Sequence, residues 1–209
     1  MSSHTPKKIV GLMGACGAGK TTVGEAWLNN YHTSDYKFLN FADPLKRLAF
    51  ENGWSGKKDD EGRAWLQDFS ERYKKIHGEM VFFDLAIEEG LASPGEVLCF
   101  GDTRFYHEIR QFIAWQHAGQ DARLVYIFNP DAERRWTVAY KNWFETGEDK
   151  FKWAVHRSEI DWRDFIRHAH GVLRIDNSEG KNSIEQAAAS LERLVVDVHV
   201  QTARLHVGF

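Results

Sequence analysis

The sequence has few cysteines and no long apolar run, and both shortages narrow the class of protein. Only Cys16 and Cys99 occur among the 209 residues, and neither has a partner at metal-ligand spacing. A disulfide framework is therefore excluded as the basis of the fold, and a reducing cytoplasm is the expected compartment. No apolar stretch approaches the ~20 residues that span a membrane, and no signal-peptide pattern follows the polar residues 1–8. We expect neither export nor a place in the membrane.

A surplus of positive charge is also lacking. The net charge is −3, which weighs against nucleic acid as a partner but still leaves room for a local basic groove. The chain has no repeats, low-complexity tracts or Pro/Gly-rich linker. Its length suffices for one α/β domain with a substantial core, so we expect a single domain spanning residues 1–209.

Short apolar runs alternate with amphipathic, helix-like segments along the chain. Strands are expected at residues 9–13, 36–40, 97–100, 124–128 and 172–175. Helices are expected at residues 20–30, from about 44 onward, at 61–77, 80–91, 105–117, throughout 131–168, and at 183–198. This alternation is typical of βαβ units. It predicts an α/β fold, a P-loop NTPase three-layer sandwich with a central, mostly parallel five-stranded sheet and a helical insertion.

The most specific motif follows the first expected strand and precedes the first expected helix. It has the pattern G-x-x-x-x-G-K-[ST] and comprises Gly14, Ala15, Cys16, Gly17, Ala18, Gly19, Lys20 and Thr21, with Thr22 next to it. In such a loop, backbone N–H groups surround phosphate oxygens and the helix dipole adds positive charge. Lys20 is expected to bridge the β- and γ-phosphates, and the Thr21 hydroxyl to bind Mg²⁺. The motif predicts that the chain binds a nucleoside triphosphate.

A second candidate anion site follows the strand expected at 36–40. Asp43 is expected to cap a helix in which Pro44 takes the first position. Lys46 then lies in the first turn, where the helix dipole disfavours a cation, and a bound anion would relieve that conflict. Two interpretations stay open here: a helix cap alone, or a cap that also forms a second phosphate site.

A third candidate follows the strand expected at 97–100. In an open parallel sheet the carboxyl ends of the strands form the ligand crevice, so Asp102 is expected to face the phosphate loop and bind Mg²⁺, directly or through water. Arg104 is placed to grip a second phosphate in bidentate fashion. An internal Asp102–Arg104 pair that only closes a turn is the alternative. Glu108, one helical turn later, either orients Arg104 or is a solvated charge.

Taken in this order, the three motifs resemble those of the deoxynucleoside monophosphate kinases of tailed bacteriophages, within the nucleoside-monophosphate kinase group. Three weaker segments agree with the family pattern and extend the resemblance over residues 9 to about 195. They are Leu66-Gln67-Asp68-Phe69, His156-Arg157-Ser158-Glu159 and Asp176-Asn177-Ser178-Glu179-Gly180. If the chain is phage-encoded, the cytoplasm is that of the host.

The resemblance implies transfer of the γ-phosphoryl group of ATP, with Mg²⁺, to a nucleoside monophosphate. By that resemblance the acceptor-binding helices lie at about 43–92, and Lys46 and Arg104 hold the acceptor phosphate. Asp43 and Glu108 belong to the same acceptor site, and Arg63 and Gln67 are candidates for the acceptor's sugar or base. Asn177 lies near the donor adenine, although an Asn-containing turn explains it equally well. Such chemistry needs alignment and charge neutralisation rather than a nucleophilic side chain.

The family carries a lid, which corresponds here to residues 131–165. Arg134 and Arg135 are about 100° apart on a helix, so only one is expected to face the site, and Arg134 and Arg157 are taken as catalytic candidates. The segment 136–162 is rich in tryptophan, which favours a small satellite core. An aromatic platform for a base is the other interpretation.

Two other functions stay open. One is a P-loop kinase for another acceptor, either a modified base in DNA or a small phosphorylated metabolite. The other is a nucleotide-dependent switch without an acceptor, for which Lys46 and Arg104 would be superfluous. The sequence does not decide which base is accepted or the oligomeric state, for which a homodimer is one alternative.

Overall fold

The structure is a computed structural model that describes residues 8–32, 35–57, 60–93, 95–169, 172–178 and 184–196, without the side chains of 60, 63, 64 and 196. The strands are β1 (Lys8–Met13), β2 (Tyr36–Leu39), β3 (Val97–Phe100), β4 (Asp121–Phe128) and β5 (Leu173–Asp176). The helices are α1 (Lys20–Tyr31), α2 (Asp43–Glu51), α3 (Asp60–His77), α4 (Val81–Leu91), α5 (Tyr106–His117), α6 (Pro130–Thr146), the 3₁₀ helix η1 (Asp149–Val155), α7 (Arg157–His168) and α8 (Ile184–Val196).

The five strands form one sheet in the order β2-β3-β1-β4-β5, and every neighbouring pair is parallel. All carboxyl ends therefore meet at one edge of the sheet. The expected α/β fold with a five-stranded parallel sheet is confirmed.

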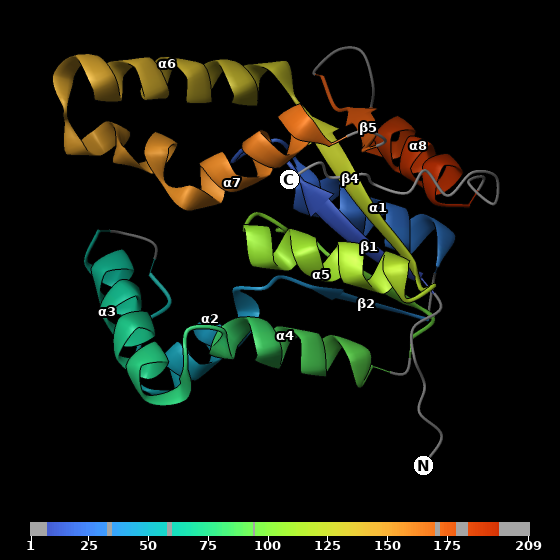
Figure 1. The fold of residues 1–209 in the computed structure, drawn as a ribbon, viewed down its shortest axis with the longest axis horizontal. Helices are drawn as coiled ribbons and strands as arrows, with labels where there is room; N and C mark the ends of the chain where they lie inside the picture. Colours follow the sequence, from blue (N-terminus) through green and yellow to red (C-terminus); the bar gives the residue numbers. More distant parts are fainter. Residues whose placement is uncertain are drawn as a thin grey trace.

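Helices cover both faces of this sheet, as expected of parallel strands (Figure 1). Because side chains alternate along a strand, Val10 and Leu12 of β1 pack with Trp27 of α1 and Leu191 of α8. Ile9 and Met13 point to the opposite face, where the core includes α5 and α7 side chains. On that face Gly11 permits a close approach, since a Cβ there would lie 2.6 Å from the Phe112 ring.

The segment expected to be helical throughout 131–168 is instead a hairpin. Gly147 takes the left-handed conformation (φ 67°) and ends α6, its N–H donating to Trp143 O at 2.9 Å, as glycine commonly does after a helix. The chain then returns through η1, which packs against α6, into α7. The prediction of a continuous helix was wrong because the helical spacing of apolar residues continues on both sides of the break at Gly147. Figure 1 shows α6 and α7 running back alongside one another.

Among the described helices, none combines the length and apolar composition that a bilayer span requires.

Candidate functional site

The three motifs meet because their strands are neighbours. The phosphate loop follows β1, Asp102 and Arg104 follow β3, and Lys46 lies in the helix after β2; these are three adjacent strands of the sheet. Backbone hydrogen bonds tie the loops together: Thr103 N–H donates to Leu12 O at 3.1 Å, and Gly101 N–H donates to Leu39 O at 2.8 Å. One continuous site therefore spans the carboxyl edge of β2, β3 and β1.

The phosphate loop has the backbone that its glycines predict. Gly17 (φ 78°) and Gly19 (φ 85°) are left-handed, a region that other L-residues rarely enter. A Cβ at Gly14 would lie 2.5 Å from Ile127 O, so the loop passes directly over β4. Lys20 is 6% exposed, and its Nζ donates to Gly14 O at 2.7 Å and Ala15 O at 2.9 Å. The ammonium is thus held at the centre of the loop.

The electrostatics of Lys20 show which other groups share this site. Burial lowers the pKa of Lys20 to about 8; the Arg104 guanidinium acts in the same direction, and Glu159, Cys16 and Asp102 oppose it. Arg104, Glu159 and Asp102 come from segments far from Lys20 in the sequence. Lys20 and Arg104 therefore lie within electrostatic range of one another, in a cluster where two carboxylates accompany the two cations.

Asp102 lies between the phosphate loop and α2. Its Oδ1 accepts a hydrogen bond from Phe41 N–H at 2.7 Å. Burial raises the pKa of Asp102, and so does the negative charge of Asp43. The positive charges of Arg104 and Lys46 lower this pKa. The carboxylate therefore bridges the two candidate phosphate sites.

Mg²⁺ in nucleotide sites is bound by phosphate oxygens and water together with one or two protein oxygens. The described residues contain no group of three or more His, Cys, Asp or Glu that could hold a metal ion alone. Thr21 is exposed on the first turn of α1, and Asp102 lies within electrostatic range of Lys20. A hydroxyl and a carboxylate next to a phosphate loop fit the ion chemically, so both residues stay candidates for it.

The cap predicted at Asp43 is arranged differently from the expectation. The cap position is Ala42, and the Asp43 carboxylate points backwards, accepting from Asn40 N–H at 2.7 Å and Asn40 Nδ2 at 3.1 Å. Because Asp43 N–H also closes a turn onto Asn40 O, Asp43 is the first helical residue rather than the cap. Its Oδ1 accepts from Lys46 Nζ at 3.0 Å. Lys46 therefore has an acid partner of its own.

Glu108 orients Arg104 through the backbone. Its Oε2 accepts from Arg104 N–H at 2.5 Å and Phe105 N–H at 3.0 Å, which caps α5. Glu108 is 3% exposed, so it is not a solvated charge. The alternative, an internal Asp102–Arg104 pair, is not among the ion pairs of the described residues; Arg104 Nη1 instead lies 3.9 Å from Glu159 Oε1.

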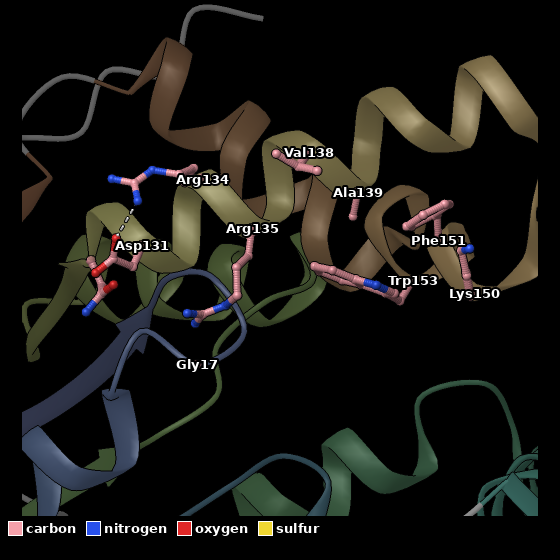
Figure 2. A pocket seen from close by; sticks show the side chains of 10 residues that line it. Gly17, Asp131, Arg134, Arg135, Val138, Ala139, Lys150, Phe151 and Trp153 are labelled. Carbon is pink, nitrogen blue, oxygen red and sulfur yellow. Dashed lines mark ion pairs between the residues drawn. The ribbon is translucent and has the colours of Figure 1, made fainter.

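Of the two adjacent lid arginines, Arg135 is the one directed at the phosphate loop. Its Nη2 lies 2.8 Å from where a Cβ on Gly17 would be, and Figure 2 shows the side chain descending from α6 onto this loop. Arg134 points elsewhere and pairs with Asp131 at 3.0 Å. Arg135 is thus the one of the two that lies against the phosphate loop, whereas Arg134 was the catalytic candidate; a catalytic role for either arginine stays a prediction.

A hollow of about 770 Å³ opens beside Arg135 under α6 (Figure 2). Its wall is part cationic and part apolar. The lining residues are Gly17, Asn129, Asp131, Arg134, Arg135, Val138, Ala139, Lys150, Phe151 and Trp153.

The segment His156-Arg157-Ser158-Glu159 forms the first turn of α7. His156 is its cap, with Nδ1 accepting from Ser158 N–H at 3.2 Å. Glu159 then points inward and is 3% exposed, toward Arg104 and Arg163. Arg157 is exposed and pairs with the buried Asp161 at 3.2 Å, so a catalytic role for Arg157 stays a prediction.

Asn177 contacts the phosphate loop directly. Its Nδ2 donates to Ala18 O at 2.9 Å, and its own carbonyl accepts from Asn129 Nδ2 at 2.7 Å. It therefore fixes the loop, and its expected place near the donor adenine stays a prediction. Gln67 is exposed on α3, and the side chain of Arg63 lies outside the described residues.

The lid tryptophans differ in their surroundings. Trp162 is 1% exposed, and the Trp136 indole donates to Ala154 O at 2.9 Å. Trp153 differs: it is 41% exposed and lines the hollow. Trp162 belongs to the main core, where its ring lies against Tyr126 of β4, so the satellite core expected of the tryptophans is wrong for Trp162. Trp136 contacts η1 within the hairpin, and Trp153 lies on the surface.

Sequence reasoning named Glu159 as part of a motif and Arg163 as a lid arginine, but it missed Glu133 and the connection between the three behind Arg104. Glu159, Arg163 and Glu133 form a connected group from α7 and α6. Glu159 and Arg163 are four residues apart, which predicts neighbours on a helix. That spacing gives no sign that the pair is buried or reaches α6.

Comparison with known proteins found similar solved structures but no family for the chain. No protein-family model matches it, and neither does any curated protein. Similar solved structures include the protein TT1252 of Thermus thermophilus, at 17% identity over 94% of this chain and 100% of that one, with a TM-score of 0.48. The APS kinase of Mycobacterium tuberculosis has 20% identity over 91% and 98%, with a TM-score of 0.41. The shikimate kinase of Acinetobacter baumannii has 17% identity over 95% and 97%, with a TM-score of 0.43.

The parallel sheet and the glycine loop between β1 and α1 define an α/β protein with a P-loop. None of the three neighbours is a deoxynucleoside monophosphate kinase by name, so the phage-type resemblance stays a prediction. At these identities and TM-scores the function must be inferred from the site itself.

Proposed function

We propose that the chain is an ATP- and Mg²⁺-dependent kinase that transfers the γ-phosphoryl group to a (deoxy)nucleoside 5′-monophosphate, giving the diphosphate. The observation that carries the proposal is the juxtaposition of two cationic sites. The positive charge of Arg104 after β3 acts on Lys20 in the phosphate loop, and the charges of Arg104 and Lys46 both act on Asp102. A donor site and a second phosphate site on neighbouring strands are what a phosphoacceptor requires.

The chain's own residues provide alignment and charge. Loop N–H groups and Lys20 hold the donor phosphates, and Arg104 and Lys46 hold the acceptor phosphate. Thr21 and Asp102 would hold Mg²⁺, which when bound would neutralise charge on the donor phosphates. Arg135, already against Gly17, supplies a further cation for the transferring group and belongs to a helix that covers the loop and excludes water.

The direct test is to incubate the protein with ATP·Mg²⁺ and each common dNMP and NMP, and to quantify ADP and nucleoside diphosphate. We expect a diphosphate from at least one monophosphate. ATP binding without any diphosphate product would refute the nucleoside monophosphate assignment.

A hydroxyl group on a modified base in DNA is the second candidate acceptor. The exposed Trp153, with Phe151 and Lys150 in the hollow beside the phosphate loop, is an aromatic and cationic surface of the kind that stacks single-stranded bases. The same assay with a single strand that carries a hydroxymethyl base distinguishes the two: label from [γ-³²P]ATP in the DNA and not in the mononucleotides would favour it.

A further inference from the structure

A buried ionic group joins the two lid helices behind Arg104. Arg163 of α7 is 7% exposed. Its Nη1 donates to Glu159 Oε2 at 2.9 Å and to the Glu159 carbonyl at 2.6 Å, and its Nη2 donates to Glu133 Oε2 of α6 at 3.1 Å. One guanidinium therefore connects α7 to α6 and satisfies one oxygen of Glu159.

Two tryptophans fix the plane of this guanidinium. The Arg163 Cζ lies 3.8 Å from the ring centroid of Trp136 and 4.2 Å from that of Trp162. Arginine stacks on aromatic rings while its edge makes bidentate hydrogen bonds, and lysine does not reproduce either geometry. The side chain is thus held in one orientation.

The other carboxylate oxygen of Glu159 faces the proposed acceptor site. Glu159 Oε1 lies 3.9 Å from Arg104 Nη1, and the Glu159 charge also raises the pKa of Lys20. A separation of 3.9 Å is an ion pair without a hydrogen bond. Arg104 is consequently attracted by Glu159, yet its terminal donors stay available for a phosphate.

We propose that Arg163 is a positioning residue for the acceptor site: by engaging Glu159 it keeps this carboxylate from closing on Arg104, and by engaging Glu133 it holds α6, which carries Arg135. This inference rests on the proposed function, in which Arg104 binds the acceptor phosphate. Without the Arg163 fork, Glu159 would be left as a poorly compensated buried charge. A direct ion pair with Arg104 would then stabilise the Glu159 carboxylate, and this pair would compete with the acceptor phosphate for Arg104.

The test compares Arg163→Lys with Arg167→Lys, the same exchange at an exposed position of the same helix. We expect Arg163→Lys to raise the acceptor KM by about 10- to 100-fold, since small misplacements of a site group cost on the order of 100-fold. The Kd for ATP should stay within about twofold, because the donor loop keeps its own contacts. A purely structural role would instead lower Tm and kcat and leave the acceptor KM unchanged, which would overturn the proposal.

Coupling to Arg104 gives a second criterion. If Arg163 acts through Arg104, Arg163→Lys should have no further effect on the acceptor KM in an Arg104→Ala background. Additive effects would contradict the inference. If Arg163→Lys does not fold, Glu133→Gln takes its place. Glutamine weakens the contact with Arg163 Nη2 without removing Arg163 itself, and the acceptor KM should rise severalfold. An unchanged KM in that variant would overturn the proposal.

A measurement without substrate separates this inference from the proposed function. The Arg104 Nε–H signal is assigned in ¹⁵N-arginine spectra by its loss in Arg104→Ala. It should shift in Arg163→Lys and stay in place in Arg167→Lys. If the wild-type protein phosphorylates no nucleoside monophosphate, the proposed function fails, while this spectrum still decides whether Arg163 controls Arg104. An identical Arg104 signal in the wild type, Arg163→Lys and Arg167→Lys would overturn the inference.

Discussion

Replacing Glu108 by glutamine tests how the start of α5 holds Arg104. Burial raises the pKa of Glu108 to about 8, and the negative charge of Asp102 raises it as well. The hydrogen bonds from Arg104 N–H and Phe105 N–H and the positive charge of Arg104 act in the opposite direction. In the folded protein this carboxyl group therefore keeps its proton near neutral pH. Glutamine resembles the protonated group and retains an oxygen that accepts the two N–H bonds.

The sign of the pH dependence follows from proton binding. The folded state keeps the proton up to about pH 8, whereas the unfolded chain loses it near its ordinary value of 4.5. Between these values the folded state binds more protons at this group. The contribution of Glu108 to wild-type stability is therefore greatest below pH 4.5 and falls as pH rises towards 8, by about 1.4 kcal/mol per pH unit. Glutamine has no such dependence.

The stability gained by Glu108→Gln over wild type should therefore grow by roughly 3 kcal/mol between pH 5.5 and 7.5. At about 2–4 °C per kcal/mol for a chain of this size, the Tm difference should grow by about 6–12 °C. Thermal unfolding followed by circular dichroism at pH 5.5, 6.5 and 7.5 measures it. Glu145→Gln, at an exposed position of α6, is the matched control and should show a constant difference. A constant difference for Glu108→Gln as well would refute the reasoning.

Three further predictions concern the site. Arg104→Ala should lower kcat/KM for the acceptor by at least about 100-fold, because a charge-assisted phosphate contact is lost; a collapse of ATP binding in a titration would instead place Arg104 in the donor site or the fold. Arg135→Ala should lower kcat by about 100-fold, and Arg134→Ala by much less; steady-state kinetics giving the reverse order would contradict the geometry of α6. Asn177→Ala removes the hydrogen bond to Ala18 O, which is worth about 1 kcal/mol, so the Kd for ATP measured by calorimetry should rise about fivefold; an unchanged Kd would show that the loop holds its shape alone.

The parts of the fold that sequence predicted are those with strong local signals. The β1–loop–α1 unit was predicted because three glycines and Lys20 follow an apolar run, and β3 was predicted at residues 97–100, its observed bounds. The start of β4 was missed by three residues. Asp121–Arg123 is polar in part, yet it pairs with Lys8–Val10 of β1. Pairing with another strand is not visible in a local apolar run.

The parts that sequence could not predict depend on contacts between distant segments. The periodicity of 131–168 does not show that the chain reverses, although Gly147 followed by Glu148 was an available turn signal. Helical spacing predicts that Arg134 and Arg135 diverge, but only the placement of α6 over the phosphate loop selects Arg135. The contact of Glu159 with Arg104 has the same origin, since it requires α7 to return to the end of β3.

Helix caps at this edge of the sheet connect local structure to the chemistry of the site. Glu108 caps α5 and thereby fixes the backbone of Arg104. His156 caps α7 and turns Glu159 inward, and Asn129 caps α6 while donating to the Asn177 carbonyl beside the phosphate loop. For these residues the structural and functional interpretations are not alternatives, because the cap itself positions a site residue. A cap substitution should therefore change substrate affinity as well as stability, whereas an equally destabilising change in the core should change stability alone.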